Sequence, residues 1–367
     1  MISSAELADL SQTIVLLGLL IGLAFGAISQ ATRFCTLGAI ADWVIMGNRS
    51  RMQHWWVAMA VAILGTQTLV VTGHFDNTAS FYTAPRLFWA SNVFGGLLFG
   101  VGMVMASGCG VRTLVRIGEG SLKAVVVFLV MSLAALMTIR GLTATWRSQT
   151  VEKVYLDLSG RQDLPNLLLG ESAASGEGRL AMGLLLAGLL MLLGLWGIRW
   201  KKALLPTAGA IGLGLLITAG WATTGWLGFI EEHPDTLAAA FVATNSKSPE
   251  SLTFVGPLAF SLELFLYWSD RSQAISFAIA TVLGTTLGSL GSALARGRFH
   301  IDGFQTNRDL LSHLVGAVLM GVGGVVAMGC TIGHGMSGVS LLALGSILSL
   351  LGILAGAWAA LIFLERV

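Results

Sequence analysis

The chain has 367 residues but only three cysteines, and each stands in a short glycine-containing stretch at the end of a long apolar run. They are Cys35 in RFCTLG, Cys109 in SGCG and Cys330 in MGCTIGHG. A neutral thiol is a weak hydrogen-bond donor with a soft, polarizable sulfur. In apolar surroundings we expect the thiol to stay protonated, which favours a binding contact over a nucleophile. These residues therefore predict recognition of a small anion that is soft at one end, such as an oxyanion of sulfur or selenium.

The number and spacing of the cysteines argue against other kinds of site. Three is an odd number and no C-x-x-C pair occurs, so neither a disulfide framework nor a zinc site is indicated. A membrane thiol oxidoreductase would need a closely spaced redox pair, which positions 35, 109 and 330 do not offer locally. No nucleotide-binding G-x-x-x-x-G-K-[ST] motif occurs either. We expect no cofactor, no metal ion and no catalytic residue.

Four residues beside the cysteines are candidates for a supporting role. Gly108 and Gly329 each precede a cysteine directly, where an interrupted helix would leave backbone N–H groups free to meet an anion. Arg112 either draws an anion to the inner mouth of a pathway or only holds a helix end at the membrane interface. His334 is either a donor in the pathway or a hydrogen-bonded packing residue, and packing is the favoured interpretation.

The cysteines also mark an internal repeat. Glycines stand 14, 9, 7 and 1 residues before Cys109 and again at the same four distances before Cys330. Gly26 stands nine residues before Cys35, and the CTLG at Cys35 matches the CTIG at Cys330. A weaker copy without cysteine, GLGLLITAGWATTGWLG, opens the second half. An odd number of crossings between corresponding copies inverts one half relative to the other, which is a common plan in transporters.

Membrane-spanning helices must position these residues. The chain is 55% hydrophobic and only 11% charged, with a mean hydropathy of +0.80, values that exclude an ordinary soluble domain. Nine charge-poor windows have the length or composition of crossings: 10–32, 55–72, 87–111, 124–139, 180–198, 203–230, 272–295 and two within 310–364. We expect an all-α polytopic membrane protein with about nine transmembrane helices, re-entrant half-helices and an inverted internal repeat. Segment 252–268 is expected to be re-entrant or interfacial.

Residues 1–367 are expected to form a single membrane transport domain. We predict a first repeat half at 1–139, an exposed, extramembrane connection at 140–179 with a short amphipathic helix near 146–158, and a second half with a linking helix at 180–367. The first apolar run is too long for a removable signal sequence and is expected to be an anchor.

The orientation of the chain follows from the short loops. Lys and Arg follow the first, third and fifth spans, which predicts an outside N-terminus and a cytoplasmic C-terminus. The net charge of +2, with no basic block, gives no reason to expect nucleic acid as a partner.

The motifs RFCTLGAIADW, ASGCGVRTLVRIGEGSLKA and MGCTIGHGMSG resemble those of the YeeE/YedE family of bacterial sulfur-transport proteins. The resemblance implies an hourglass-shaped inner-membrane bundle that takes up thiosulfate. It also implies that Cys35, Cys109 and Cys330 meet in a central constriction and pass the anion by S–H hydrogen bonds, and that a small cytoplasmic sulfur-relay protein of the TusA type is a partner.

Other functions stay open at this point. Longer members of the family are linked to selenium metabolism, so a selenium compound or another sulfur species is an alternative substrate, and a thiol oxidoreductase is an alternative activity. A purely structural membrane subunit would leave the matched cysteines unexplained.

Overall fold

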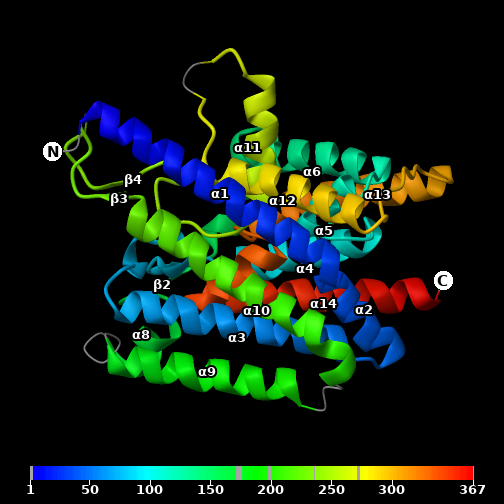
Figure 1. Ribbon diagram of the computed structural model, residues 1–367, viewed down its shortest axis with the longest axis horizontal. Helices are drawn as coiled ribbons and strands as arrows, with labels where there is room; N and C mark the ends of the chain where they lie inside the picture. The colour runs from blue at the N-terminus through cyan, green and yellow to red at the C-terminus, as the bar shows by residue number, and fades with distance from the viewer. Residues whose placement is uncertain (1–2, 171–175, 197–199, 235, 271–272, 367) are drawn as a thin grey trace.

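The computed structural model describes residues 3–170, 176–196, 200–234, 236–270 and 273–366. Nine helical stretches within these residues are long and apolar enough to cross a membrane, which confirms the predicted all-α polytopic membrane class. The long helices lie along the long axis of the molecule, with the N-terminus at one end and the C-terminus at the other (Figure 1). We call these two ends the N-terminal face and the C-terminal face.

The helices follow the order that the apolar windows predict. The first half contains α1 (Ser4–Thr32), α2 (Thr36–Met46), α3 (Ser50–Val71), α4 (Trp89–Met105), α5 (Gly110–Gly118) and α6 (Leu122–Arg140). Helix α9 (Glu177–Leu195) links it to the second half, which contains α10 (Trp200–Ala222), α11 (Val255–Leu266), α12 (Phe277–Ala295), α13 (Asn307–Val326) and α14 (Leu344–Arg366).

Short elements join the long helices. They are the 3-10 turns η1 (Asn77–Ala79), η2 (Phe81–Thr83) and η3 (Val151–Lys153), the helices α7 (Leu142–Gln149) and α8 (Leu164–Leu169), and the π-helical η4 (Thr223–Leu227) and η5 (Gly333–Gly338). Strand β1 (Arg86–Leu87) pairs antiparallel with β2 (Leu156–Asp157), and β3 (Phe229–Ile230) with β4 (Ala240–Phe241). Strands β2, β3 and β4 lie toward the N-terminal face (Figure 1).

Helix α11 does not cross the membrane. Its 12 residues extend only about 18 Å at a rise of 1.5 Å per residue, whereas the apolar part of a bilayer is about 30 Å thick. It stands across the direction of the long helices (Figure 1), and its buried Glu263 pairs with Arg140 at the end of α6. This placement agrees with the re-entrant or interfacial segment predicted there.

The two halves exchange packing partners. Helix α1 packs on α12 while α3 packs on α10, and α4 packs on α14 while α13 packs on α6. Where α4 crosses α13, Gly95 faces Gly323 and Gly102 faces Gly316. Gly95 and Gly316 occupy the same position of the repeat, as do Gly102 and Gly323, because each pair is 221 residues apart, like Cys109 and Cys330. Such exchanged pairing is what a two-fold relation between inverted halves produces.

Glycines allow the closest of these helix crossings. A Cβ atom added at Gly26 of α1 would overlap the carbonyl oxygen of Thr285 in α12, and one at Gly288 of α12 would overlap that of Leu23 in α1. Small residues at such contacts let helix backbones approach each other inside a membrane. Gly26 and Gly288 therefore serve close packing at this crossing.

The connection between the halves folds back onto the N-terminal face, so the expectation of an exposed loop is wrong for part of it. Gln162, Asp163 and Asn166 are buried, and Asp163 forms an ion pair with Arg179 at the start of α9. The short helix expected near 146–158 lies earlier, as α7, and the later part of that range instead contains a 3-10 turn and strand β2. Residues 171–175 of the predicted loop lie outside the described part of the chain.

Candidate functional site

Each cysteine stands at a break in an apolar helical run. The residue two positions before it has a left-handed backbone, with φ of 54° at Arg33, 55° at Ser107 and 64° at Met328. Non-glycine residues rarely adopt this conformation, and at a helix end it turns the chain out of the hydrogen-bond ladder. Helices α1, α4 and α13 therefore stop before the cysteines, and a new helical segment starts after each of them. The interruptions expected at the three motifs are present.

The sulfur atoms lie at the N-termini of the new segments. The Cys35 Sγ accepts a hydrogen bond from the Gly38 N–H at 3.4 Å, and the Cys330 Sγ accepts one from the Gly333 N–H at 3.4 Å. Cys109 occupies the N-cap position of α5. Because a thiol can accept and donate at once, its S–H remains available to a ligand. The positive end of each helix dipole lies on the side of its cysteine.

The three breaks meet inside the molecule. Cys109 lies within electrostatic range of both Cys35 and Cys330. Cys109 and Cys330 are 2% and 1% exposed, whereas Cys35 is partly exposed. The side chain of Thr331 lies near the Cys109 thiol, and its buried hydroxyl has no hydrogen bond of its own to the described residues. Two buried thiols and a partly exposed one thus form a connected group.

Cys35 opens into a cavity of about 490 Å³ that we call the basic pocket. The other residues that line it are Arg33, Arg51, Arg112, Glu119, Arg298 and His300. Two internal ion pairs occur there, Arg112 with Glu119 at 3.5 Å and Arg51 with Asp42 at 3.1 Å. Four guanidinium groups against one lining carboxylate give the pocket a positive potential that favours anions.

Part of the basic pocket was not predicted from the sequence. Arg112 lies in it, as one of the two interpretations of that residue requires. Arg298 and His300 were missed because they belong to the connection between α12 and α13, far from the cysteine motifs along the chain. The only available signal was that basic residues occur in a short loop.

Gly108 and Gly329 make room for neighbouring side chains. A Cβ atom at Gly108 would lie 3.0 Å from Cγ of Arg112, and one at Gly329 would lie 2.8 Å from the imidazole ring of His334. The two glycines occupy the same position of the repeat, one residue before a cysteine. Each therefore lets a longer side chain fold back over the helix break.

His334 is held by two hydrogen bonds. Its Nε2 lies 2.6 Å from the Ala327 carbonyl oxygen, and its Nδ1 lies 3.1 Å from the Ser346 hydroxyl. Because a carbonyl only accepts, Nε2 carries the proton and Ser346 donates to Nδ1. Both ring nitrogens are thus engaged within the protein, which supports the packing interpretation of this buried histidine.

A second polar group lies on the other side of Cys330. The Thr253 hydroxyl lies 3.8 Å from the Cys330 sulfur, and the side chain of Tyr82 contacts Thr253. Glu250 is buried nearby, with one carboxylate oxygen 3.3 Å from the Ser246 hydroxyl and the other without a partner among the described residues. Burial raises the pKa of Glu250 to about 7. No sequence motif marks this group.

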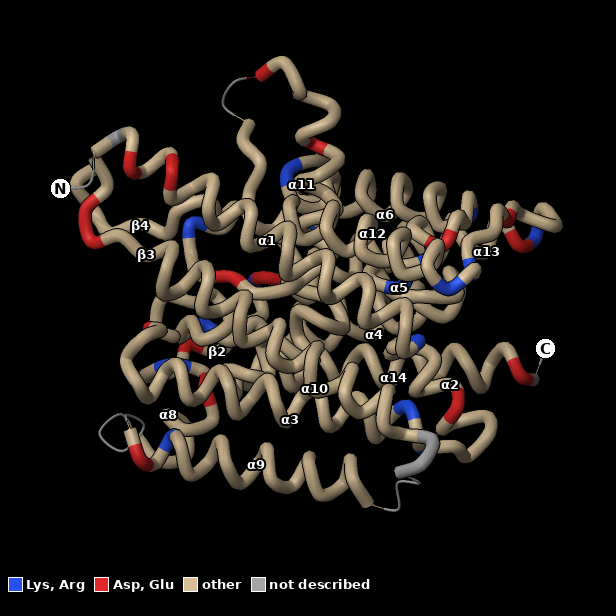
Figure 2. Tube along the Cα trace, in the orientation of Figure 1, with Lys and Arg blue, Asp and Glu red and all other residues tan. Residues whose placement is uncertain are grey.

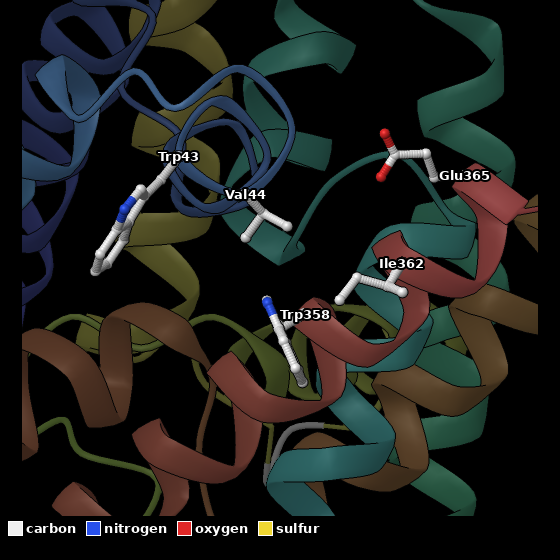
Figure 3. A pocket seen from close by; sticks show the side chains of 5 residues that line it. All are labelled: Trp43, Val44, Trp358, Ile362 and Glu365. Atoms are coloured by element: carbon white, nitrogen blue, oxygen red, sulfur yellow. The ribbon is translucent and has the colours of Figure 1, made fainter.

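A different cavity, of about 660 Å³, lies between α2 and α14 (Figure 3). Trp43 and Val44 of α2 and Trp358, Ile362 and Glu365 of α14 line it. Among the described residues, none lines both this cavity and the basic pocket. Its exposed tryptophans match the aromatic belt expected where helices meet the membrane surface.

Comparison with known proteins gives a family match over most of the chain, two relatives that cover nearly all of it and one that covers a third. A family model described as sulphur transport matches residues 31–359. The chain is 27% identical over 359 residues to the thiosulfate transporter TsuA of Escherichia coli (strain K12), covering 95% of this chain and 94% of that protein. It is 25% identical over 371 residues to TsuA of Spirochaeta thermophila, covering 93% and 96%. A probable transporter, YedE of Escherichia coli (strain K12), is 31% identical over 122 residues, 33% of this chain and 28% of that protein.

Proposed function

The chain belongs to the sulphur transport family, and from this premise we propose that it carries thiosulfate, or a closely related sulfur anion, across the bacterial inner membrane. Nine helical stretches in the described part of the chain are long and apolar enough to cross a membrane, which makes it a multi-pass membrane protein. Two relatives that span almost its full length are named thiosulfate transporters. The geometry of the three cysteines supports the same substrate class, because a thiol is both soft and a hydrogen-bond donor.

In the proposed mechanism the anion moves from thiol to thiol without any covalent bond being made or broken. At each step an S–H donates to the anion while the helix N-terminus behind it contributes a positive partial charge. Thiols are weak donors, so each contact is weak enough to release the ion to the next. The buried Cys109 and Cys330 form the narrow part of the path, and Cys35 delivers the ion to the basic pocket.

One observation carries this proposal: cysteines from both halves of the chain come together at three helix breaks. Cys109 lies close enough for electrostatic interaction both to Cys35, in its own half, and to Cys330, in the other half. Three cysteines that served only as small hydrophobic residues would have no reason to lie near one another, and Cys35 is not even fully buried. Neither would they need a left-handed residue two positions earlier in every case.

We place the C-terminal face, with the basic pocket, in the cytoplasm. The pocket gathers arginines from four separate parts of the chain at that end of the bundle, and Lys and Arg near the ends of membrane helices favour the cytoplasmic side. An anion leaving Cys35 is then held close to the membrane surface. A small sulfur-relay protein of the TusA type is the proposed partner that takes it up there.

The direct test is uptake of radiolabelled thiosulfate by purified protein reconstituted into liposomes. Single substitutions Cys35→Ser, Cys109→Ser and Cys330→Ser should each abolish most of the uptake, because a hydroxyl is shorter and less polarizable than a thiol. Ser91→Ala is the matched control, since it also alters one buried polar group but stands near the far end of α4. This control should transport like the unmodified protein.

Competition distinguishes the substrates. Unlabelled thiosulfate should suppress uptake far more than sulfate, selenite or selenate at equal concentration. Stronger suppression by a selenium compound would reassign the substrate, and unchanged uptake in all three serine variants would overturn the role of the cysteines.

A further inference from the structure

We propose that Thr253 is a fourth hydrogen-bonding step of the path, ahead of Cys330, and that it takes in the second half the place that Cys35 takes in the first. The proposal rests on the proposed function and extends it to the entry of the anion. Nothing in the cysteine motifs points to this residue, because it lies 77 positions before Cys330.

The contacts of Thr253 place it at the outer edge of the cysteine group. Its hydroxyl oxygen lies 3.8 Å from the Cys330 sulfur. A Cβ atom added at Gly333 would lie 2.5 Å from the Thr253 Oγ1 and 3.1 Å from the Tyr82 hydroxyl oxygen. Both hydroxyls therefore converge over the helix N-terminus that Cys330 begins. Only the absence of a side chain at Gly333 leaves them this room.

Along the proposed path, the solvent exposure of Thr253 and the three cysteines is higher at both ends than in the middle. Thr253 is partly exposed, Cys330 and Cys109 are buried, and Cys35 is partly exposed again. Thr253 thus mirrors Cys35 across the closed centre. An anion that arrives from the N-terminal face meets the hydroxyl first and reaches the basic pocket last.

The short helices that follow the two residues are also matched. Cys35 directly precedes α2, and Thr253 stands two residues before α11. The start of α11 reaches the centre of the molecule, because Phe254 and Leu258 are the nearest side chains to Gly110, the residue after Cys109. Each half therefore brings the tip of one short helix, with one small polar side chain, to the cysteine group.

The difference in chemistry gives Thr253 a distinct task. An O–H is a stronger hydrogen-bond donor than an S–H, and it replaces one water molecule lost by an oxyanion at nearly equal strength. It recognises the oxygen atoms that thiosulfate and sulfate share. We assign to Thr253 the capture of an oxyanion in general, and to the thiols beyond it the discrimination in favour of a soft sulfur.

The test compares Thr253→Val with Thr253→Ser in the liposome uptake assay. Valine keeps the shape but loses the donor, so the KM for thiosulfate should rise roughly tenfold to a hundredfold, the usual effect of losing a hydrogen bond to a charged group. The inhibition constant of sulfate should rise by the same factor. Serine retains the hydroxyl and should restore both values to within about threefold of the unmodified protein.

Two controls separate the possible outcomes. Thr244→Val removes another partly exposed hydroxyl from the same segment and should leave the KM unchanged. Cys109→Ser is measured in parallel. If Thr253→Val transports normally while Cys109→Ser fails, the entry step is overturned and the thiol path stands. If Cys109→Ser also transports normally, the path itself is wrong. Equal losses in Thr253→Val and Thr253→Ser would assign Thr253 a purely structural role and overturn the proposal.

Discussion

Gly108 and Gly329 shape the cysteine breaks through the side chains that they lack. Beside Gly329, the ring of His334 lies over the helix end and donates to the Ala327 carbonyl, which would otherwise be left without a helical partner. Beside Gly108, Arg112 follows the backbone toward the basic pocket. The supporting role predicted for the two glycines stays a prediction for transport, but their local effect on packing is plain.

We expect Gly329→Ala to destabilise the protein. The added methyl group would lie 2.8 Å from the imidazole of His334, so the ring must move and its hydrogen bond to Ala327 weakens, at a cost of about 1–3 kcal/mol. Gly291→Ala is the matched control, because a Cβ atom added at that position in α12 would meet no neighbouring atom of the described residues within 4 Å. Thermal unfolding in detergent should show a lower Tm for Gly329→Ala only, and equal Tm values would contradict this account.

Glu250 should make stability depend on pH. Burial raises its pKa from 4.5 to about 7, so between these values the unfolded chain ionises this carboxyl group while the folded protein keeps it protonated. The free energy of unfolding therefore falls as the pH rises through this window, by about 1.4 kcal/mol for each unit of pKa difference, and is constant above it. Glu250→Gln should reduce the difference in Tm between pH 5 and pH 8. The same change at the exposed Glu232 should leave that difference as it is.

Among the elements, the helix breaks were predicted well where the signal was local. Cys35, Cys109 and Cys330 each stand within a few residues of the helix that ends, so glycine, serine and threonine in the motif indicate the break directly. The position of Thr253 before α11 could not be found in this way. In the second half, 27 residues separate the end of η4 at Leu227 from the start of α11 at Val255, so the cysteine-free repeat copy carries no sign of Thr253.

Other parts of the site depend on tertiary structure alone. Arg298 and His300 enter the basic pocket because α12 packs on α1, which brings the end of α12 beside the break at Cys35. The sequence of the loop between α12 and α13 contains no pattern that predicts this contact. The buried part of the connection between the halves was likewise unpredictable, because polar residues such as Gln162 and Asp163 find their partners in distant elements.

The α1–α12 crossing should be the most sensitive helix contact. Gly288→Ala would place a methyl group on the carbonyl oxygen of Leu23, which forces the two backbones apart and should lower the Tm by several degrees. Gly188→Ala in α9 serves as the control, because its added methyl group would have no neighbour within 4 Å in the part of the chain that the structure describes, and alanine favours a helix over glycine by up to about 1 kcal/mol. A Tm for Gly288→Ala at or above that of Gly188→Ala would contradict the close crossing.

At the scale of the whole molecule, the position of the basic pocket at the C-terminal face gives a prediction about orientation. Lys and Arg residues occur toward both ends of the bundle (Figure 2), but the four arginines of the pocket come together at a single site beside Cys35. Green fluorescent protein fused after residue 367 should therefore fluoresce in the cytoplasm. Alkaline phosphatase fused at the same point should be inactive, and an active phosphatase fusion would reverse the proposed direction of transport.

The exchange of packing partners between the halves has a consequence for biosynthesis. The glycine face of α1 is covered by α12, and Gly22 contacts Thr281, a residue that the ribosome adds more than 250 residues later. At about 5–20 residues per second, that delay is roughly 13–50 seconds. During this interval α1 lies in the lipid without α12, the helix that packs against its glycine-containing face. A nascent chain that stalls before α12 therefore leaves the glycine-containing face of α1 without its packing partner. An unpaired helix face of this kind is a defect that a membrane protease or chaperone can detect.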